Sequence, residues 1–144
     1  MFIVEHLITS FIASAAFGII FNVPKRALPQ CGFVGMVGWL IYIALVNYFS
    51  VDMLLATLVA AVFIAIISQT FAKFYKTPII VFNVSGIIPL VPGGMAYDAM
   101  RHIVENDYST AVQLATKAFM VSGSIAIGLV FSEVINQMIK RSKI

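Results

Sequence analysis

The chain has 144 residues, of which 61% are hydrophobic and only 10% are charged, and its mean hydropathy is +1.02. A soluble domain is about one quarter charged, so this composition leaves too little charge to cover a globule and indicates an integral membrane protein. The net charge of +3 does not indicate a nucleic-acid partner, because the basic residues lie in short clusters between apolar runs. We therefore expect a single, all-α transmembrane domain over residues 1–144.

Five apolar segments follow one another along the chain, each near the roughly 20 residues that a membrane-spanning helix needs. They are predicted at residues 2–21, 31–49, 52–72, 78–96 and 111–139. Small residues recur at helical spacing in four of them, which predicts close approach of neighbouring helices. These residues are Ser14 and Gly18; Gly32, Gly35 and Gly38; Ala56, Ala60, Ala61 and Ala65; and Ser122, Gly123, Ser124 and Gly128.

The charges outside these segments predict the orientation. With five crossings, the loops at 22–30 and 73–77 and the C-terminal tail share one side, and they hold seven of the nine basic residues. Positive charge stays cytoplasmic, so the N-terminus is predicted outside and the C-terminus inside. Because Lys25 and Arg26 follow the first segment and no basic residue precedes it, we interpret that segment as a membrane helix rather than a cleaved signal. Residues 97–110 are the most polar part and are predicted to form a short surface helix and a loop, while Lys117 and Glu133 are expected to snorkel to the interfaces.

The fourth segment is interrupted by two prolines and three glycines between Ser85 and Gly94. Pro89 and Pro92 lack an N–H group, so the carbonyls of Ser85 and Ile88 are predicted to lose their helical donors. An unpaired backbone group in hydrocarbon costs several kcal/mol, so protein or water must cover the break. Pro89 lies eleven residues after Pro78, or about 16 Å along a helix and roughly half of a 30 Å hydrocarbon core.

Broken helices at this depth form the substrate sites of many transporters; the alternative is a kinked helix packed against its neighbours. Backbone carbonyls suit an ammonium and the first N–H groups after Gly94 suit a carboxylate, so a zwitterion matches both. The candidate substrate path comprises Asn83, Ser85, Ile88, Pro89, Pro92, Gly93, Gly94, Tyr97 and Asp98. Asp98 is the candidate for proton coupling, with a solvated loop carboxylate as the alternative. Asn22, Lys25 and Arg26 are candidates for the inner mouth, although the two cations act mainly as topology signals.

Residues for enzymatic or metal chemistry are sparse. Cys31 is the single cysteine, which excludes an internal disulfide, and we predict a buried thiol. His6 and His102 have no ligand cluster in the sequence and are interpreted as simple interfacial histidines. No phosphate loop, zinc spacing or nucleophile motif is present in the sequence. We therefore predict a protein that is not an enzyme and uses no metal or cofactor.

Two stretches resemble the threonine/serine exporter family. Residues 21–28, FNVPKRAL, continuing to Cys31 and Gly35, are similar to its first loop, and PLVPG at 89–93 followed by Tyr97 is similar to its proline-glycine motif. The resemblance is to short, membrane-only members and covers nearly the whole chain. It implies proton-driven export of threonine and serine across the bacterial cytoplasmic (inner) membrane.

The resemblance also implies a partner. Longer members carry a soluble portion and a first membrane half, whereas this chain resembles the second half alone. Two five-helix halves in tandem must be inverted relative to each other, as in many alternating-access carriers. We therefore expect a hetero-oligomer with a separately encoded membrane subunit, and homo-oligomerisation as the second possibility. Two other functions stay open: export of a dicarboxylate such as succinate, and a non-transporting assembly or scaffold role.

Overall fold

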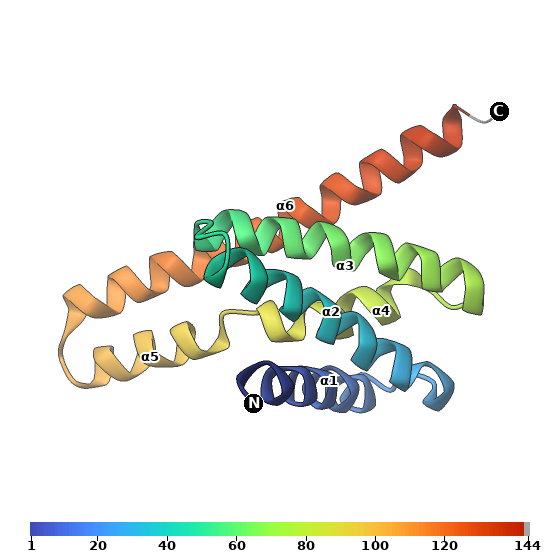
Figure 1. The fold of residues 1–144 in the computed structure, drawn as a ribbon. Helices are drawn as coiled ribbons and strands as arrows, with labels where there is room; N and C mark the ends of the chain where they lie inside the picture. The colour runs from blue at the N-terminus through green and yellow to red at the C-terminus, as the bar shows by residue number, and fades with distance from the viewer. Residues whose placement is uncertain (143–144) are drawn as a thin grey trace.

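The computed structural model describes residues 1–142, which form six α-helices and two 3₁₀ turns, with no strand in that part of the chain (Figure 1). The elements are α1 (Phe2–Ile20), η1 (Lys25–Ala27), α2 (Leu28–Asn47), α3 (Met53–Tyr75), α4 (Ile79–Ile87), η2 (Ile88–Leu90), α5 (Gly93–Val104) and α6 (Tyr108–Arg141). Helices α1, α2, α3 and α6 are long and apolar enough to cross a membrane. The segment from α4 through η2 is bent by 52° against α5, and it makes a fifth span if the bent pair is counted as one. The all-helical prediction with about five spans, the fourth broken, is confirmed.

Several boundaries differ from the prediction. Helix α2 begins three residues earlier, at Leu28, with Pro29 in its first turn, where a missing N–H group breaks no helical bond. Helix α3 continues to Tyr75, and α5 continues past the predicted end of the fourth segment to Val104. The polar region after residue 97 is therefore mostly the second half of α5, and only residues 105–107 form the loop before α6.

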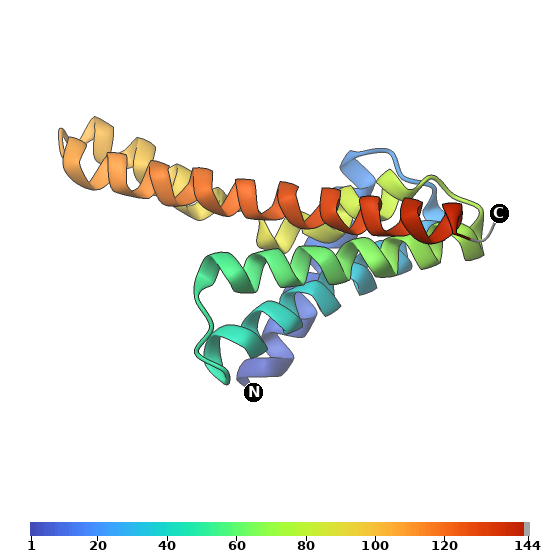
Figure 2. The ribbon, with the colours of Figure 1, turned by 90° about the horizontal axis from the view of Figure 1, so that it is seen from above.

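The connections between the helices lie at the two ends of the bundle. The α1–α2 connection, the α3–α4 connection and the end of α6 lie toward the same end of the bundle in both views, although α6 projects away from the other two in Figure 1 (Figures 1 and 2). These are the segments that carry the clustered basic residues, as five crossings require. At the other end, α5 and the start of α6 form a hairpin that extends beyond the N-terminus and the α2–α3 connection (Figure 1). The 34 residues of α6 span about 51 Å, well beyond a 30 Å hydrocarbon core.

Helix α2 holds the bundle together through its glycines. A Cβ atom at Gly32 would lie 2.8 Å from the ring of Phe11 in α1, and one at Gly38 would collide with Ile64 in α3. On α4, a Cβ atom at Gly86 would lie 2.6 Å from Cγ1 of Val34. The close-packing face predicted at Gly32, Gly35 and Gly38 is confirmed, since all three are buried against α1, α3 or α4.

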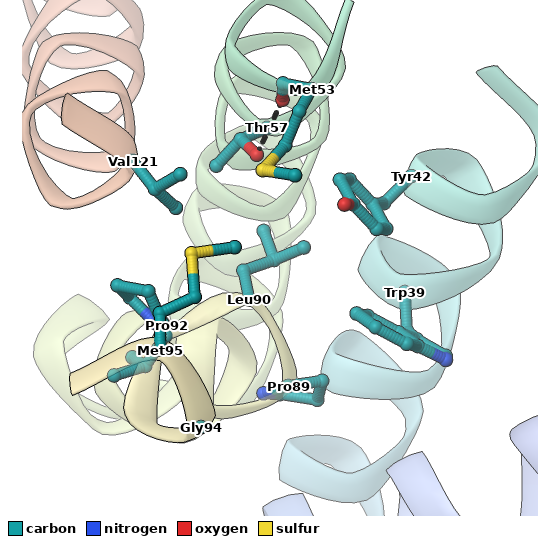
Figure 3. Close-up of a pocket in the computed structure, with 11 residues that line it drawn as sticks. Trp39, Tyr42, Met53, Thr57, Pro89, Leu90, Pro92, Gly94, Met95 and Val121 are labelled. Atoms are coloured by element: carbon teal, nitrogen blue, oxygen red, sulfur yellow. Dashed lines mark hydrogen bonds between the residues drawn. The ribbon is translucent and has the colours of Figure 1, made fainter. Parts of the chain in front are cut away.

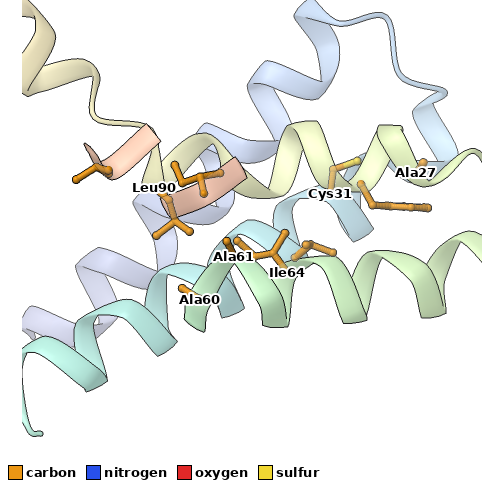
Figure 4. Packing of buried hydrophobic residues seen from close by; sticks show 10 residues of the cluster. Ala27, Cys31, Ala60, Ala61, Ile64 and Leu90 are labelled. Atoms are coloured by element: carbon orange, nitrogen blue, oxygen red, sulfur yellow. The ribbon is translucent and has the colours of Figure 1, made fainter. Parts of the chain in front are cut away.

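The buried core lies where α2, α3, α4 and α6 meet (Figure 4), and small side chains on α3 allow α6 to approach it closely. A Cβ atom at Gly128 would lie 2.8 Å from both Cβ of Ala61 and the carbonyl oxygen of Leu58. Gly123 has open space where a Cβ atom would lie, and Ser122 is exposed. Within this chain, the small-residue face predicted on α6 is therefore used at Gly128 but not at Gly123.

Candidate functional site at the proline break

The break occurs where the prolines predict it, but its hydrogen bonding differs from the prediction. After Ile87 the chain tightens into the 3₁₀ turn η2, and Val91 is extended, with φ −61° and ψ 129°. The N–H group of Val91 donates to the carbonyls of Ile87 (3.2 Å) and Ile88 (3.3 Å). The expectation that the Ile88 carbonyl is free is therefore wrong, because a 3₁₀ turn supplies a donor three residues on.

The carbonyl of Pro89 is left without a helical donor instead. The residue three positions on is Pro92, which has no N–H group. The residue four positions on is Gly93, whose N–H group donates to the carbonyl of Val91 at 2.8 Å. Helix α5 begins at Gly93, so the N–H groups of Gly94 and Met95 lie in its first turn and have no acceptor within the helix. The break thus offers the carbonyl of Pro89 as an acceptor and the N–H groups of Gly94 and Met95 as donors within a few residues of chain.

A cavity of about 200 Å³ borders the break (Figure 3). Its lining combines the break with side chains of α2, α3 and α6: Trp39, Tyr42, Met53, Thr57, Pro89, Leu90, Val91, Pro92, Gly94, Met95 and Val121. Most of these side chains are apolar, which gives the cavity hydrophobic walls with a small number of polar groups. This is the usual composition of a small-molecule site.

Two of the three polar side chains in the lining are already engaged. The indole N–H group of Trp39 donates to Nδ1 of His6 at 3.1 Å, and the Thr57 hydroxyl donates to the carbonyl of Met53 at 2.8 Å. Tyr42 stacks on Trp39 with ring centroids 5.1 Å apart, and its hydroxyl points toward the cavity (Figure 3). That hydroxyl has no hydrogen-bond partner among residues 1–142. Tyr42 is therefore the side chain best placed to meet a polar group in the cavity.

The residues of the predicted substrate path lie in three separate places: at the break, on α4 and on α5. Pro89, Pro92 and Gly94 line the break cavity, and Ile88 and Gly93 are their neighbours in the chain. On α4, Ser85 lines a separate cavity of about 240 Å³ beside the α1–α2 connection. On α5, Tyr97 is 69% exposed and Asp98 lies 4.0 Å from Arg101. The structure therefore brings together the middle of the predicted path but not its two ends.

Two side-chain oxygen atoms on α4 are buried without partners. The Ser85 hydroxyl and the Asn83 side-chain oxygen make no hydrogen bond among the described residues, and Ser85 is fully buried. The thiol of Cys31 donates to the carbonyl of Val81 at 3.6 Å. Cys31 is buried, as predicted. A buried hydroxyl without a partner is destabilising.

The residues predicted at the inner mouth lie away from the break, and the two histidines contact other side chains. Asn22, Lys25 and Arg26 are exposed in the α1–α2 connection, at the end of the bundle opposite the α5–α6 hairpin. His6 has a defined partner in Trp39, and His102 lies 3.5 Å from Asp107 and 3.7 Å from Glu105. Within residues 1–142, no group of three side chains is arranged to hold a metal ion.

Sequence reasoning missed the cavity residues outside the break: Trp39, Tyr42, Met53, Thr57, Met95 and Val121. One signal was present, since Trp39 falls near the middle of its segment, where an interfacial anchor is not expected. The structure explains it by the hydrogen bond to His6 and the stacking on Tyr42.

Residues 6–135 match the model of a family described as "Threonine/Serine exporter, ThrE". The matched range contains all five predicted segments except the ends of the first and last, and it includes the whole break cavity. No solved structure matches the chain.

Proposed function

The chain belongs to the threonine/serine exporter family, as a multi-pass membrane component, and from this premise we propose how it works. It forms one half of a proton-coupled secondary transporter in the bacterial inner membrane, and a separately encoded membrane subunit forms the other half. Threonine or serine binds in the cavity beside the break. The observation that carries the proposal is the position of that cavity against unpaired backbone groups in a bent span.

The depth of the break supports a substrate site. The nine residues of α4 and three of η2 rise about 20 Å from Pro78, which brings the break into the middle part of a 30 Å core. Secondary transporters bind solute at this depth, between half-helices whose ends face the ligand. Non-helical backbone is tolerated there only when it lines a cavity or is covered by protein.

The polar groups of the break match the two charges of an amino acid. The carboxylate is bound by the N–H groups of Gly94 and Met95, where the positive end of the α5 dipole adds attraction. The ammonium is bound by the carbonyl of Pro89, which has no helical donor. The Tyr42 hydroxyl is placed to meet the hydroxyl that threonine and serine share.

The proposal of a partner subunit is supported by the surface around the break that no other part of residues 1–142 covers. Helix α5 packs mainly on α6, and Gly93, Gly94 and Gly123 have open space where a Cβ atom would lie. A second membrane subunit covers this side and closes the site. The basic connections at the opposite end favour a cytoplasmic location for that end, with the N-terminus outside. Asp98, half exposed beside Arg101, remains our proposed proton-coupling group.

Tyr42→Phe tests the proposed site, because it removes the hydroxyl and keeps the ring that stacks on Trp39. In proteoliposomes that contain both subunits, we expect threonine flux at low concentration to fall by about three- to tenfold, the effect of one hydrogen bond. Tyr48→Phe, at an exposed position beyond the end of α2, is the matched control and is expected to leave flux unchanged.

Equal flux in the two variants would refute the cavity as the site. A wild-type complex that carries succinate but not threonine would replace the substrate with a dicarboxylate. Flux that persists after the break is exchanged for a regular Leu/Ala helix, with the complex intact, would establish a scaffold role.

A further inference from the structure

We propose that Asp52 and Lys117 form a second binding site for the zwitterionic solute, one step further along the path from the break cavity. This inference rests on the proposed function and extends it. The two side chains line a cavity of about 320 Å³ between the start of α3 and α6, together with Met53, Leu54, Met120 and Val121. Helix α3 begins toward the end of the bundle from which the α5–α6 hairpin projects (Figure 1).

The new cavity adjoins the break cavity. Met53 and Val121 line both, so these two apolar side chains form the wall between them. Figure 3 shows both side chains at the edge of the break cavity, with Met53 on α3 and Val121 on α6. A methionine side chain is flexible, so Met53 is the part of this wall that a rotamer change can move. A solute that leaves the break on this side therefore passes directly to Asp52 and Lys117.

The two charged residues are exposed and do not form an ion pair with each other. Asp52 is the N-cap of α3, where its Oδ2 atom accepts from the N–H group of Leu54 at 3.1 Å, and this hydrogen bond orients the carboxylate. No carboxylate among residues 1–142 lies within 4.0 Å of the Lys117 ammonium, so the two side chains do not neutralise each other. A carboxylate and an ammonium that share a cavity without pairing are complementary to an ammonium and a carboxylate on one small molecule.

This arrangement selects for amino acids over dicarboxylates. The solute ammonium faces Asp52, the solute carboxylate faces Lys117, and the short side chain contacts Met53 or Val121. A dicarboxylate places its second negative charge near Asp52, where like charges repel. The polar cavity at the basic end contrasts with this site: it shares no lining residue with the break cavity, and its carboxylate, Glu133, already accepts from Gln69 and Gln137.

Two charge-removing variants test the site in the intact two-subunit complex. Asp52→Asn keeps a good helix N-cap while it removes the negative charge, and Lys117→Gln keeps a good helix former. Each has a matched control with the same chemical change elsewhere: Asp107→Asn at the N-cap of α6, and Lys140→Gln near the end of the same helix. Melting temperatures of all four variants check that the fold is retained.

We expect Asp52→Asn and Lys117→Gln each to raise the KM for threonine by about fivefold, the upper range for exposed charge pairs, while the controls stay at the wild-type value. Asp52→Asn is also expected to make succinate a stronger competitor, and Lys117→Gln to make it weaker. The site is refuted if both variants keep the wild-type KM, or if succinate competition is the same in all four. A wild-type complex that carries no threonine refutes the proposed function instead, so the two failures are distinguishable.

Discussion

Gly86→Ala adds one methyl group at the position that seats α4 on its neighbours. The new Cβ atom would lie 2.6 Å from Cγ1 of Val34 and 3.0 Å from Cγ2 of Ile64. Both neighbours are fully buried, so neither has free space into which to move. Overpacking of this kind costs about 1–3 kcal/mol, and the better helix propensity of Ala offsets about 1 kcal/mol of it. Because Gly86 lies three residues before Pro89, any shift of α4 also displaces the break, so we expect lower transport.

The matched control is Gly123→Ala on α6, where nothing lies within 4 Å of the added atom. It is expected to gain about 1 kcal/mol from helix propensity alone. The difference between the two variants therefore isolates the packing term of about 1–3 kcal/mol, measured as free energy of unfolding by denaturant titration in detergent. Combining Gly86→Ala with Val34→Ala removes the shorter of the two contacts and leaves the one with Ile64, so the double-mutant cycle is expected to give a favourable coupling. A Gly86→Ala protein as stable as Gly123→Ala would refute the packing of α4.

Three further outcomes follow from single contacts. Ser85→Ala removes a buried hydroxyl without a partner, so we expect the unfolding free energy to stay equal or rise by about 1 kcal/mol. A loss of stability would contradict this. Trp39→Phe removes the indole N–H group that donates a hydrogen bond to His6, and we expect the unfolding free energy to fall by about 1 kcal/mol. An unchanged unfolding free energy would argue against that hydrogen bond. The hydroxyl and the backbone N–H group of Thr110 donate to Asp107 and lower the pKa of its carboxyl, with a smaller effect of His102. Because the folded pKa is depressed, this cap stabilises α6 above about pH 4 and is lost as the pH falls further. Hydrogen exchange of the first α6 amides is expected to show this acid dependence in the wild type and not in Asp107→Asn.

Local features of the sequence predicted the helices and the break. The apolar runs predict the spans, and the missing N–H groups of Pro89 and Pro92 predict where the fourth helix is interrupted. The stripe of Gly32, Gly35 and Gly38 predicts a close-packing face because its spacing follows the helical repeat. Each of these inferences depends on residues within a few turns of one another.

The detailed chemistry of the site depends on conformation and on distant segments. The sequence assigns the freed carbonyl to Ile88 only if the chain stays α-helical; the 3₁₀ turn pairs Ile88 and frees Pro89 instead. Tyr42 and Val121 join the cavity from helices far along the chain, and spacing within one helix does not predict such a meeting. Spacing within α6 also predicted close packing at both Gly123 and Gly128, although only Gly128 faces α3.

The central claim is that threonine binds beside the break, and protection of a cysteine at Gly94 tests it most directly. Gly94 lines the cavity, and nothing lies within 4 Å of an added Cβ atom there, so Gly94→Cys fits without strain from contacts. With Cys31, the single native cysteine, replaced by alanine, the two-subunit complex is treated with a water-soluble thiol reagent. Met100→Cys, at an exposed position on α5, is the control.

Saturating threonine is predicted to slow the labelling of Gly94→Cys severalfold and to leave the labelling of Met100→Cys unchanged. Labelling of Gly94→Cys at the same rate with and without threonine, in a complex that transports threonine, would contradict the proposed site.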